Sequence, residues 1–244
     1  MNESFIQDKQ KMRPTATRAG PKRAPAKLAA IARASRQVLS ANGPRLTQVA
    51  DVARGAGVAS GTVYLYVAEK EALLEIALLS AARFDLPEAT TPVTFNAARL
   101  RKTTARALQE RLTWPLLEAA LRHPPQPQTL RAVLEETYDL LRRERELIAL
   151  LDRCSAEIKV MEQLFIKGAR RRFFMEFETC LRRLADAGYV RRDIDLAAAS
   201  RAAIEMLVWM AMRRPGDPDP PHCNKEAART ASIAFALAGL SRAC

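Results

Sequence analysis

Apolar residues recur at intervals of three and four through almost the whole chain after residue 24. This is the period of an α-helix, in which every third or fourth side chain falls on the same face. Leu28, Ile31 and Val38 form the first such stripe, with the small Ser35 between them. We find no alternating apolar pattern and no hairpin dipeptide that would predict a strand. The sequence therefore predicts an all-α fold of about nine helices.

Short helices are predicted in the first third of the chain. Pro25 suits the first turn of a helix, and Asn42-Gly43-Pro44 is typical of a helix end. Thr47 is expected to cap the second helix through its side-chain oxygen, and Gly57 supplies the backbone angles of a tight turn after it. The predicted helices cover about 25–42, 47–55 and 60–66, with a fourth from about Glu69.

The remainder of the chain is almost wholly helical in pattern. The predicted helices cover about 93–122, 127–152, 156–187, 193–214 and 224–242. Pro115 should kink or split the first of them, because proline removes a helical hydrogen bond. We expect three parts: a disordered basic arm over 1–24, a small helical domain over 25–70 and a larger one over 71–244.

Positive charge is concentrated at the N-terminal end. The net charge of the chain is +12, and residues 1–70 contain 12 Lys and Arg against 4 Asp and Glu. An excess of this kind favours a polyanionic partner, although a solvated basic tail would give the same composition. The arm, with Arg18, Lys22, Arg23 and Lys27, could add nonspecific charge or enter a minor groove.

Several classes of protein are disfavoured by the sequence. The four cysteines form no CxxC pair and the only histidines are His123 and His222, so neither a disulfide framework nor a metal site is expected. The sequence contains no Gly-rich phosphate loop and no Ser/His/Asp set, so nothing in it indicates an enzyme, and we expect no cofactor. No stretch resembles a signal peptide or a membrane span, so we expect a cytoplasmic protein.

Residues 45–74 carry the most specific pattern, which reads as helix, tight glycine turn, helix. Ala53 and Gly57 are small enough for two helices to cross closely, and Val52, Val58 and Val63 can form a core between them. A helix-turn-helix requires this arrangement. The second of these helices begins with small polar residues, where a DNA major groove would meet it.

This stretch resembles the DNA-binding domain of the TetR family of bacterial regulators. The residues that carry the resemblance are Val52-Ala53, Ala56-Gly57-Val58, Gly61-Thr62-Val63-Tyr64, Tyr66, Lys70-Glu71 and Leu73. Gln48, Ala59 and Val67 depart from the family pattern, and Ser60 is expected to cap the third helix in place of residue 59. None of these departures removes a positive charge.

The resemblance implies which residues contact DNA. Thr47 and Gln48 would meet phosphate or a base edge, Ser60, Gly61 and Thr62 would enter the groove, and Gly61 would let the backbone approach closely. The hydroxyls of Tyr64 and Tyr66 and the ammonium of Lys70 would bind phosphates. Two alternatives stay open: Tyr64 could belong partly to the core, and Lys70 could pair with Glu71 or Glu75.

The resemblance further implies that the larger domain binds a ligand and forms a homodimer. Aromatic and aliphatic side chains could line an apolar cavity, although such a stripe can equally be ordinary core. The candidate pocket residues are Trp114, Leu117, Leu121, Tyr138, Leu141, Phe173 and Phe177. Glu118 and Glu157 could face this cavity and favour a cation, or could be solvated.

The last two predicted helices would pair with the same two helices of a second subunit and form a four-helix bundle. The candidate interface residues are Ile204, Leu207, Val208, Ala211, Ile233, Leu237 and Leu240. Alternatively, both stripes pack within their own subunit. Two-fold symmetry would make the operator an inverted repeat.

The resulting hypothesis is a homodimeric TetR-like regulator of double-stranded DNA, a repressor that a small molecule releases from its operator. Two alternatives remain at this point. A partner protein could control the regulator in place of a small molecule, or the chain could be a helical module whose basic arm binds membrane lipid.

Overall fold

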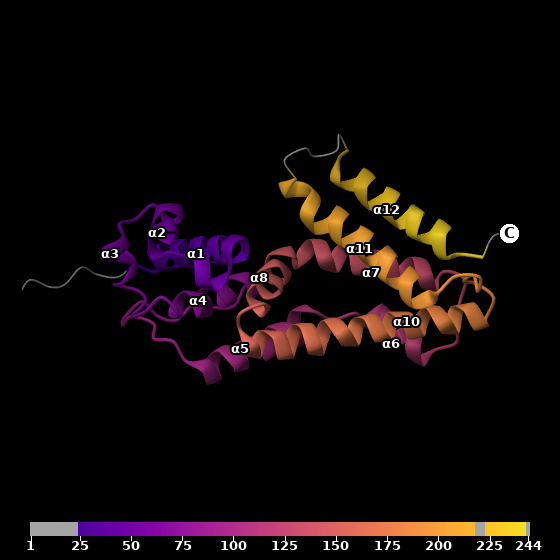
Figure 1. Cartoon of the computed structure of the whole chain (residues 1–244), viewed down its shortest axis with the longest axis horizontal. Helices are drawn as coiled ribbons and strands as arrows, with labels where there is room; N and C mark the ends of the chain where they lie inside the picture. Colours follow the sequence, from indigo (N-terminus) through magenta and orange to yellow (C-terminus); the bar gives the residue numbers. More distant parts are fainter. Residues whose placement is uncertain (1–23, 218–222, 243–244) are drawn as a thin grey trace, which may run out of the picture.

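The chain folds as an elongated assembly of helices, with a small group at one end and a larger bundle at the other (Figure 1). The computed structural model describes residues 24–217 and 223–242. Within these residues the regular structure is helical, apart from isolated bridges that pair Val67 with Val93 and Val190 with Ser241. The predicted all-α class is confirmed. The predicted arm lies outside the described residues, except for Ala24.

The small group consists of α1 (Pro25–Leu46), α2 (Val49–Ala56), α3 (Ser60–Val63) and α4 (Ala72–Ala82). The helical geometry of α1 is interrupted at Gly43, whose φ of 79° and ψ of 169° are not helical, so the predicted helix end at Asn42-Gly43-Pro44 coincides with this kink. Each of the four helices contributes to one buried core, in which Ile31, Val52, Val63 and Ile76 pack together. Burial of such aliphatic side chains stabilises short helices that would not form alone.

Helix α4 belongs to both parts of the molecule. Leu73 and Ile76 pack in the core of the small group, whereas Leu74 and Leu78 pack in a second core with helices of the larger part. The core of the N-terminal domain therefore continues beyond the boundary that we predicted at residue 70.

The segment between α4 and α5 returns to the small group. The backbone N–H of Val93 donates to the carbonyl of Tyr66 at 2.8 Å, and the N–H of Ala68 donates to the carbonyl of Val93 at 2.9 Å. Asn96 then caps α5 by accepting the N–H of Arg99 at 2.9 Å. The predicted helix start at residue 93 is wrong for this reason.

The larger part contains the remaining helices. Their bounds are α5 (Ala97–Arg111), α6 (Pro115–Arg122), α7 (Thr129–Arg143), α8 (Arg145–Ser155), α9 (Lys159–Met161), η1 (Glu162–Arg170), α10 (Arg171–Asp186), α11 (Leu196–Val208), η2 (Trp209–Arg213), η3 (Arg214–Gly216) and α12 (Lys225–Leu240). Pro115 starts α6, so the predicted split at this residue is confirmed. None of the described helices is long and apolar enough to cross a membrane.

The helix predicted over 127–152 is two helices that separate at Glu144. The side chain of Glu144 is only 1% exposed, and its carboxylate accepts hydrogen bonds from Arg83 at 2.5 and 2.6 Å. Arg143 also donates to it at 3.1 Å. A buried carboxylate needs such hydrogen-bond partners. The bonds from these arginines therefore hold Glu144 in place at the break between α7 and α8.

Two segments of π-helix, η1 and η2, interrupt the later helices. A π-helix inserts an extra residue into the turn, and such segments occur frequently at functional sites. The sequence period did not distinguish them from α-helix, so they were absent from our prediction.

Candidate functional site

Helices α2 and α3 form a helix-turn-helix around Gly57. Its φ of 67° is in the left-handed region, which glycine adopts without the strain of a side chain. The backbone N–H of Gly57 donates to the carbonyl of Arg54 at 3.2 Å, and that of Val58 donates to the carbonyl of Ala53 at 3.0 Å. These bonds satisfy carbonyls at the end of α2 and set the direction of α3.

The N-terminal half of α3 faces solvent at one end of the molecule (Figure 1). Ser60 and Gly61 are exposed, Thr62 is half-buried, and Tyr64 is 50% exposed directly after the helix. Val63 points inward and is fully buried, which fixes the rotation of the helix. A Cβ atom on Gly61 would meet no atom of the protein within 4 Å. Nothing in the fold itself therefore requires glycine at this position.

Polar and basic side chains lie beside this face. Gln48 is exposed at the start of α2, and Lys70 donates from Nζ to the carbonyl oxygen of Arg45 at 3.1 Å. Lys70 therefore contacts the end of α1 rather than Glu71 or Glu75. Arg45 is exposed at this point, and sequence reasoning missed it, although an arginine two residues before Thr47 was the available signal.

Two predicted DNA contacts are corrected by burial. Thr47 is fully buried, and its hydroxyl donates to the carbonyl of Gly43 at 2.7 Å. Tyr66 is 3% exposed, and its hydroxyl accepts the backbone N–H of Ala24 at 2.8 Å. Both side chains hold the domain together and are withdrawn from the surface that faces solvent.

The predicted side-chain caps of α2 and α3 are also wrong. The N-cap of α2 is Gln48 and that of α3 is Ala59, and neither side chain forms a capping bond. Thr47 instead closes the end of α1, and Ser60 is the first residue inside α3. The N-terminus of α3 thus has no side-chain cap, and Ser60 and Gly61 lie at its exposed face.

A cavity of about 620 Å³ lies where α1 meets the larger part. Its apolar lining includes Leu141, Phe173 and Ile204 from three helices of the bundle, and Trp114 from the segment before α6. Trp114 and Phe173 contact each other with ring centroids 4.6 Å apart. The π-helices η1 and η2 contribute to the wall through residues that include Phe165 and Met212.

Polar residues also line the cavity, and they come from α1 and α8 as well as from α7, η1, α11 and η2. Arg36, Gln37 and Ser40 come from α1, and Glu146 and Arg153 come from α8. Helix α1 therefore takes part both in the helix-turn-helix core and in the cavity wall.

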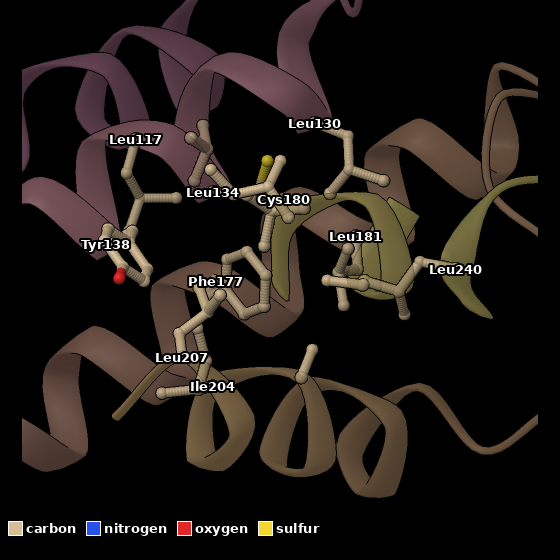
Figure 2. Close-up of a cluster of buried hydrophobic side chains, with 14 of the residues drawn as sticks. Leu117, Leu130, Leu134, Tyr138, Phe177, Cys180, Leu181, Ile204, Leu207 and Leu240 are labelled. Atoms are coloured by element: carbon tan, nitrogen blue, oxygen red, sulfur yellow. The ribbon is translucent and has the colours of Figure 1, made fainter. Parts of the chain in front are cut away.

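Four of the predicted pocket residues do not line this cavity. Trp114, Leu141 and Phe173 do line it. Leu117, Tyr138 and Phe177 are instead buried in the closed core of the bundle, as Figure 2 shows, and Leu121 packs against that core. The aromatic stripe is therefore divided between core and cavity.

The predicted acidic residues of the cavity are also corrected. Glu118 lies within 3.7 Å of Arg122 and 4.0 Å of Arg172, and Glu157 accepts the backbone N–H of Arg45 at 2.7 Å. Neither carboxylate is part of the cavity wall.

Residues 31–77 match the model of the bacterial regulatory proteins of the tetR family. The chain is a TetR-family DNA-binding transcriptional regulator. The match covers the helix-turn-helix and most of α4. Membership makes the chain a regulator rather than an enzyme. No curated protein matches the sequence.

Solved structures resemble the TetR-family chain over most of its length. A member of the TetR transcriptional regulator family from Streptomyces coelicolor A3 has a TM-score of 0.56 at 19% identity, covering 87% of this chain and 91% of that one. The ketosteroid transcriptional regulator KstR2 of Mycobacterium tuberculosis has a TM-score of 0.52 at 18% identity, covering 92% and 99%. AibR, solved in complex with isovaleryl coenzyme A and operator DNA, has a TM-score of 0.51 at 14% identity, covering 86% and 97%. At these identities the likeness is one of fold.

The predicted dimer stripes of this TetR-family regulator lie mostly inside its own subunit. Ile204, Leu207, Ala211, Ile233 and Leu240 are buried in the core of the bundle, while Val208 and Leu237 are partly buried against it. Figure 2 shows Ile204, Leu207 and Leu240 in this cluster. The alternative that the stripes pack within the subunit is therefore correct for these residues.

A different face of the last two helices is open to solvent. On α12, Phe235 is 72% exposed and is flanked by the exposed Ala231, Ala234 and Ala238. On η2, Trp209 is 37% exposed. Sequence reasoning selected the buried stripe because it is the more regular of the two.

Proposed function

We propose that the protein is a homodimeric repressor that binds an inverted-repeat operator and is released when a small molecule fills the cavity. The observation that carries this proposal is the double role of α1. This helix packs against α2 in the helix-turn-helix domain and supplies part of the cavity wall. A ligand that moves α1 would therefore change the position of α3.

The exposed part of α3 is suited to enter a major groove. Ser60, Gly61 and Thr62 would approach base edges, with the missing side chain of Gly61 allowing close contact. Tyr64, Gln48, Lys70 and Arg45 would bind the phosphates beside the groove. Gly61 leaves space at the surface that the fold does not use, which supports this assignment.

The cavity is suited to a small organic ligand. Its volume of about 620 Å³ falls within the range of about 300–1,000 Å³ that such sites have. AibR was solved in complex with isovaleryl coenzyme A and operator DNA. This supports the proposal that a fold of this type can bind both a small molecule and DNA.

The open face of α11, η2 and α12 is the surface that we assign to the dimer. A second copy would bury Phe235 and Trp209, and the alanines beside Phe235 would allow the helices of two subunits to approach closely. We predict that Phe235→Glu yields monomers in analytical ultracentrifugation. Met175, which is 60% exposed on α10, provides the matched control, and Met175→Glu should remain dimeric.

The proposal is tested by selecting duplexes from a random DNA library with the full chain. We expect enrichment of an inverted repeat whose half-sites lie about one helical turn or more apart. Enrichment of a single unpaired half-site would contradict the dimeric arrangement. If no small molecule that occupies the cavity weakened binding to the selected duplex, control by a partner protein would be favoured instead.

A further inference from the structure

The charged residues of the cavity wall indicate the chemical class of the ligand. Five arginines line the cavity against three carboxylates, which are Glu146, Asp152 and Glu205. An excess of cationic side chains around an apolar space favours an anionic guest.

Each of the three carboxylates already has an arginine partner. Glu146 pairs with Arg36, and Asp152 pairs with Arg170 at 3.0 Å. Glu205 pairs with Arg201 at 2.7 Å and with Arg170 at 3.5 Å. These carboxylates are therefore neutralised within the protein and do not offer a site to a cation.

The remaining arginines of the wall have no carboxylate partner. Within residues 24–217 and 223–242, Arg145, Arg153 and Arg213 form no ion pair, and Arg153 donates only to the carbonyl of Asn42, at 2.8 Å. Arg145 and Arg213 are exposed at the edge of the cavity. A planar guanidinium binds carboxylate, sulfonate or phosphate oxygens in pairs, so these residues can receive such a group.

Apolar side chains make up another part of the lining. Trp114, Leu141, Phe173 and Ile204 would surround the apolar part of a guest, and burial of that part would supply most of the binding free energy. The cavity thus combines an apolar lining from the bundle with arginines on α8 and η2 that have no carboxylate partner.

We infer that the effector is an amphipathic organic anion, with its apolar body against Trp114 and Phe173 and its charged group beside Arg145 and Arg213. This inference rests on the proposed small-molecule control and specifies the class of the effector. Arg36 and its partner Glu146 also line the cavity, so a bound anion would compete with Glu146 for that arginine. Binding would in this way weaken a contact between α1 and α8.

The inference is tested without DNA, so that its failure can be told apart from failure of the operator model. Isothermal titration calorimetry of the full chain compares decanoate with the matched neutral decan-1-ol and the matched cation decylammonium. Anilinonaphthalene sulfonate serves as an aromatic anion. We expect saturable binding of at least one of the two anions, with decanoate or the sulfonate binding at least tenfold more tightly than decan-1-ol and decylammonium.

The double variant Arg145→Gln and Arg213→Gln should weaken anion binding about tenfold and leave decan-1-ol binding unchanged. Arg182→Gln is the control, because Arg182 is exposed on α10 and is not part of the cavity wall. Tighter binding of decylammonium or of the alcohol would overturn the inference. So would unchanged anion binding in the double variant, or the absence of saturable binding by both anions.

Discussion

Arg36 of α1 and Glu146 of α8 form an ion pair that crosses from the DNA-binding domain to the larger domain on the wall of the cavity. Two further bonds cross the same boundary. Arg153 donates to the carbonyl of Asn42 at 2.8 Å, and the N–H of Arg45 donates to the Glu157 carboxylate at 2.7 Å. The end of α1 that leads into the helix-turn-helix is therefore held by α8 and by the residues that follow it.

Removal of the charge on Glu146 tests whether this pair couples the two domains. In Glu146→Gln the half-exposed carboxylate is lost, which should cost about 0.5–1 kcal/mol of unfolding free energy. Hydrogen exchange of the α1 amides after Arg36 should become faster, because α8 no longer restrains them. Glu110→Gln, which breaks an exposed pair with Arg106 within α5, is the control. Equal exchange in both variants would show that the pair does not restrain α1.

Tyr64 and Tyr66 are expected to respond oppositely to loss of the hydroxyl. Tyr66→Phe removes the bond to the Ala24 N–H and should lower the unfolding free energy by about 1 kcal/mol, with operator affinity nearly unchanged once the protein is folded. Tyr64→Phe should leave stability unchanged and weaken operator binding several-fold, since its exposed hydroxyl is assigned to a phosphate.

Thermal unfolding and fluorescence anisotropy on the selected duplex measure the two effects in each variant. If Tyr66→Phe weakened DNA binding and Tyr64→Phe did not, the DNA contact would have to be assigned to Tyr66 and not to Tyr64. Tyr64→Ala should also remain dimeric, because Tyr64 directly follows α3, and α3 lies at the opposite end of the molecule from α12 (Figure 1).

Glu144 is predicted to be essential to the stability of the larger domain. Its buried carboxylate accepts bonds from Arg83 and Arg143, and Arg111 lies 3.9 Å away. Glu144→Gln would leave these guanidinium groups without a compensating charge. We expect a loss of about 2–3 kcal/mol, somewhat less than for a fully buried pair because Arg83 is partly exposed.

Chemical denaturation measures this loss, and Glu135→Gln is a control in which a partly exposed carboxylate, 3.8 Å from Arg131 and 3.9 Å from Arg229, is removed. A Glu144→Gln variant as stable as this control would show that the buried network contributes little.

The cysteines should differ in reactivity across a pH series. Burial raises the pKa of Cys154 to about 12 and that of Cys180 to about 11, because the thiolate is desolvated. The thiolate is the reactive form, so both residues should stay unlabelled by iodoacetamide below about pH 10 in the folded protein. Cys223, which is partly exposed, should be labelled.

Mass spectrometry of peptides from native and urea-unfolded protein distinguishes the three sites. In the unfolded chain all three should react at the same pH, which provides the internal control. Labelling of Cys154 in the native state at pH 8 would indicate that the core opens more readily than the packing implies.

The helix-turn-helix could be predicted from sequence because its determinants are local. Gly57 sets the turn, and Val52 and Val63 set the rotation of the two helices within twelve residues of chain. The role of Tyr66 could not be predicted in the same way, since its hydroxyl partner is the N–H of Ala24, 42 positions earlier. Burial of Thr47 likewise depends on the bend at Gly43.

The larger domain was predicted as helical, and its site was predicted only in part, because Trp114, Leu141 and Phe173 line the cavity whereas the other candidate pocket residues do not. A stripe of apolar residues shows that a face is buried, and it does not show whether the partner belongs to the same subunit. Ile204 and Leu207 were assigned to a dimer for this reason, whereas they pack within the bundle. The break at Glu144 and the π-helix η1 depend on contacts with other helices, so the sequence period gave no indication of either.

The most direct test of the account is the operator affinity of Gly61→Ala. The fold has room for the added methyl group, so the variant should be at least as stable as the wild type. Gly216→Ala, which adds a methyl group in equally open space at the end of η3, is the control. If α3 enters the groove through Gly61, anisotropy on the selected duplex should show at least tenfold weaker binding by Gly61→Ala and unchanged binding by Gly216→Ala. Wild-type affinity in Gly61→Ala would contradict the placement of this helix against DNA.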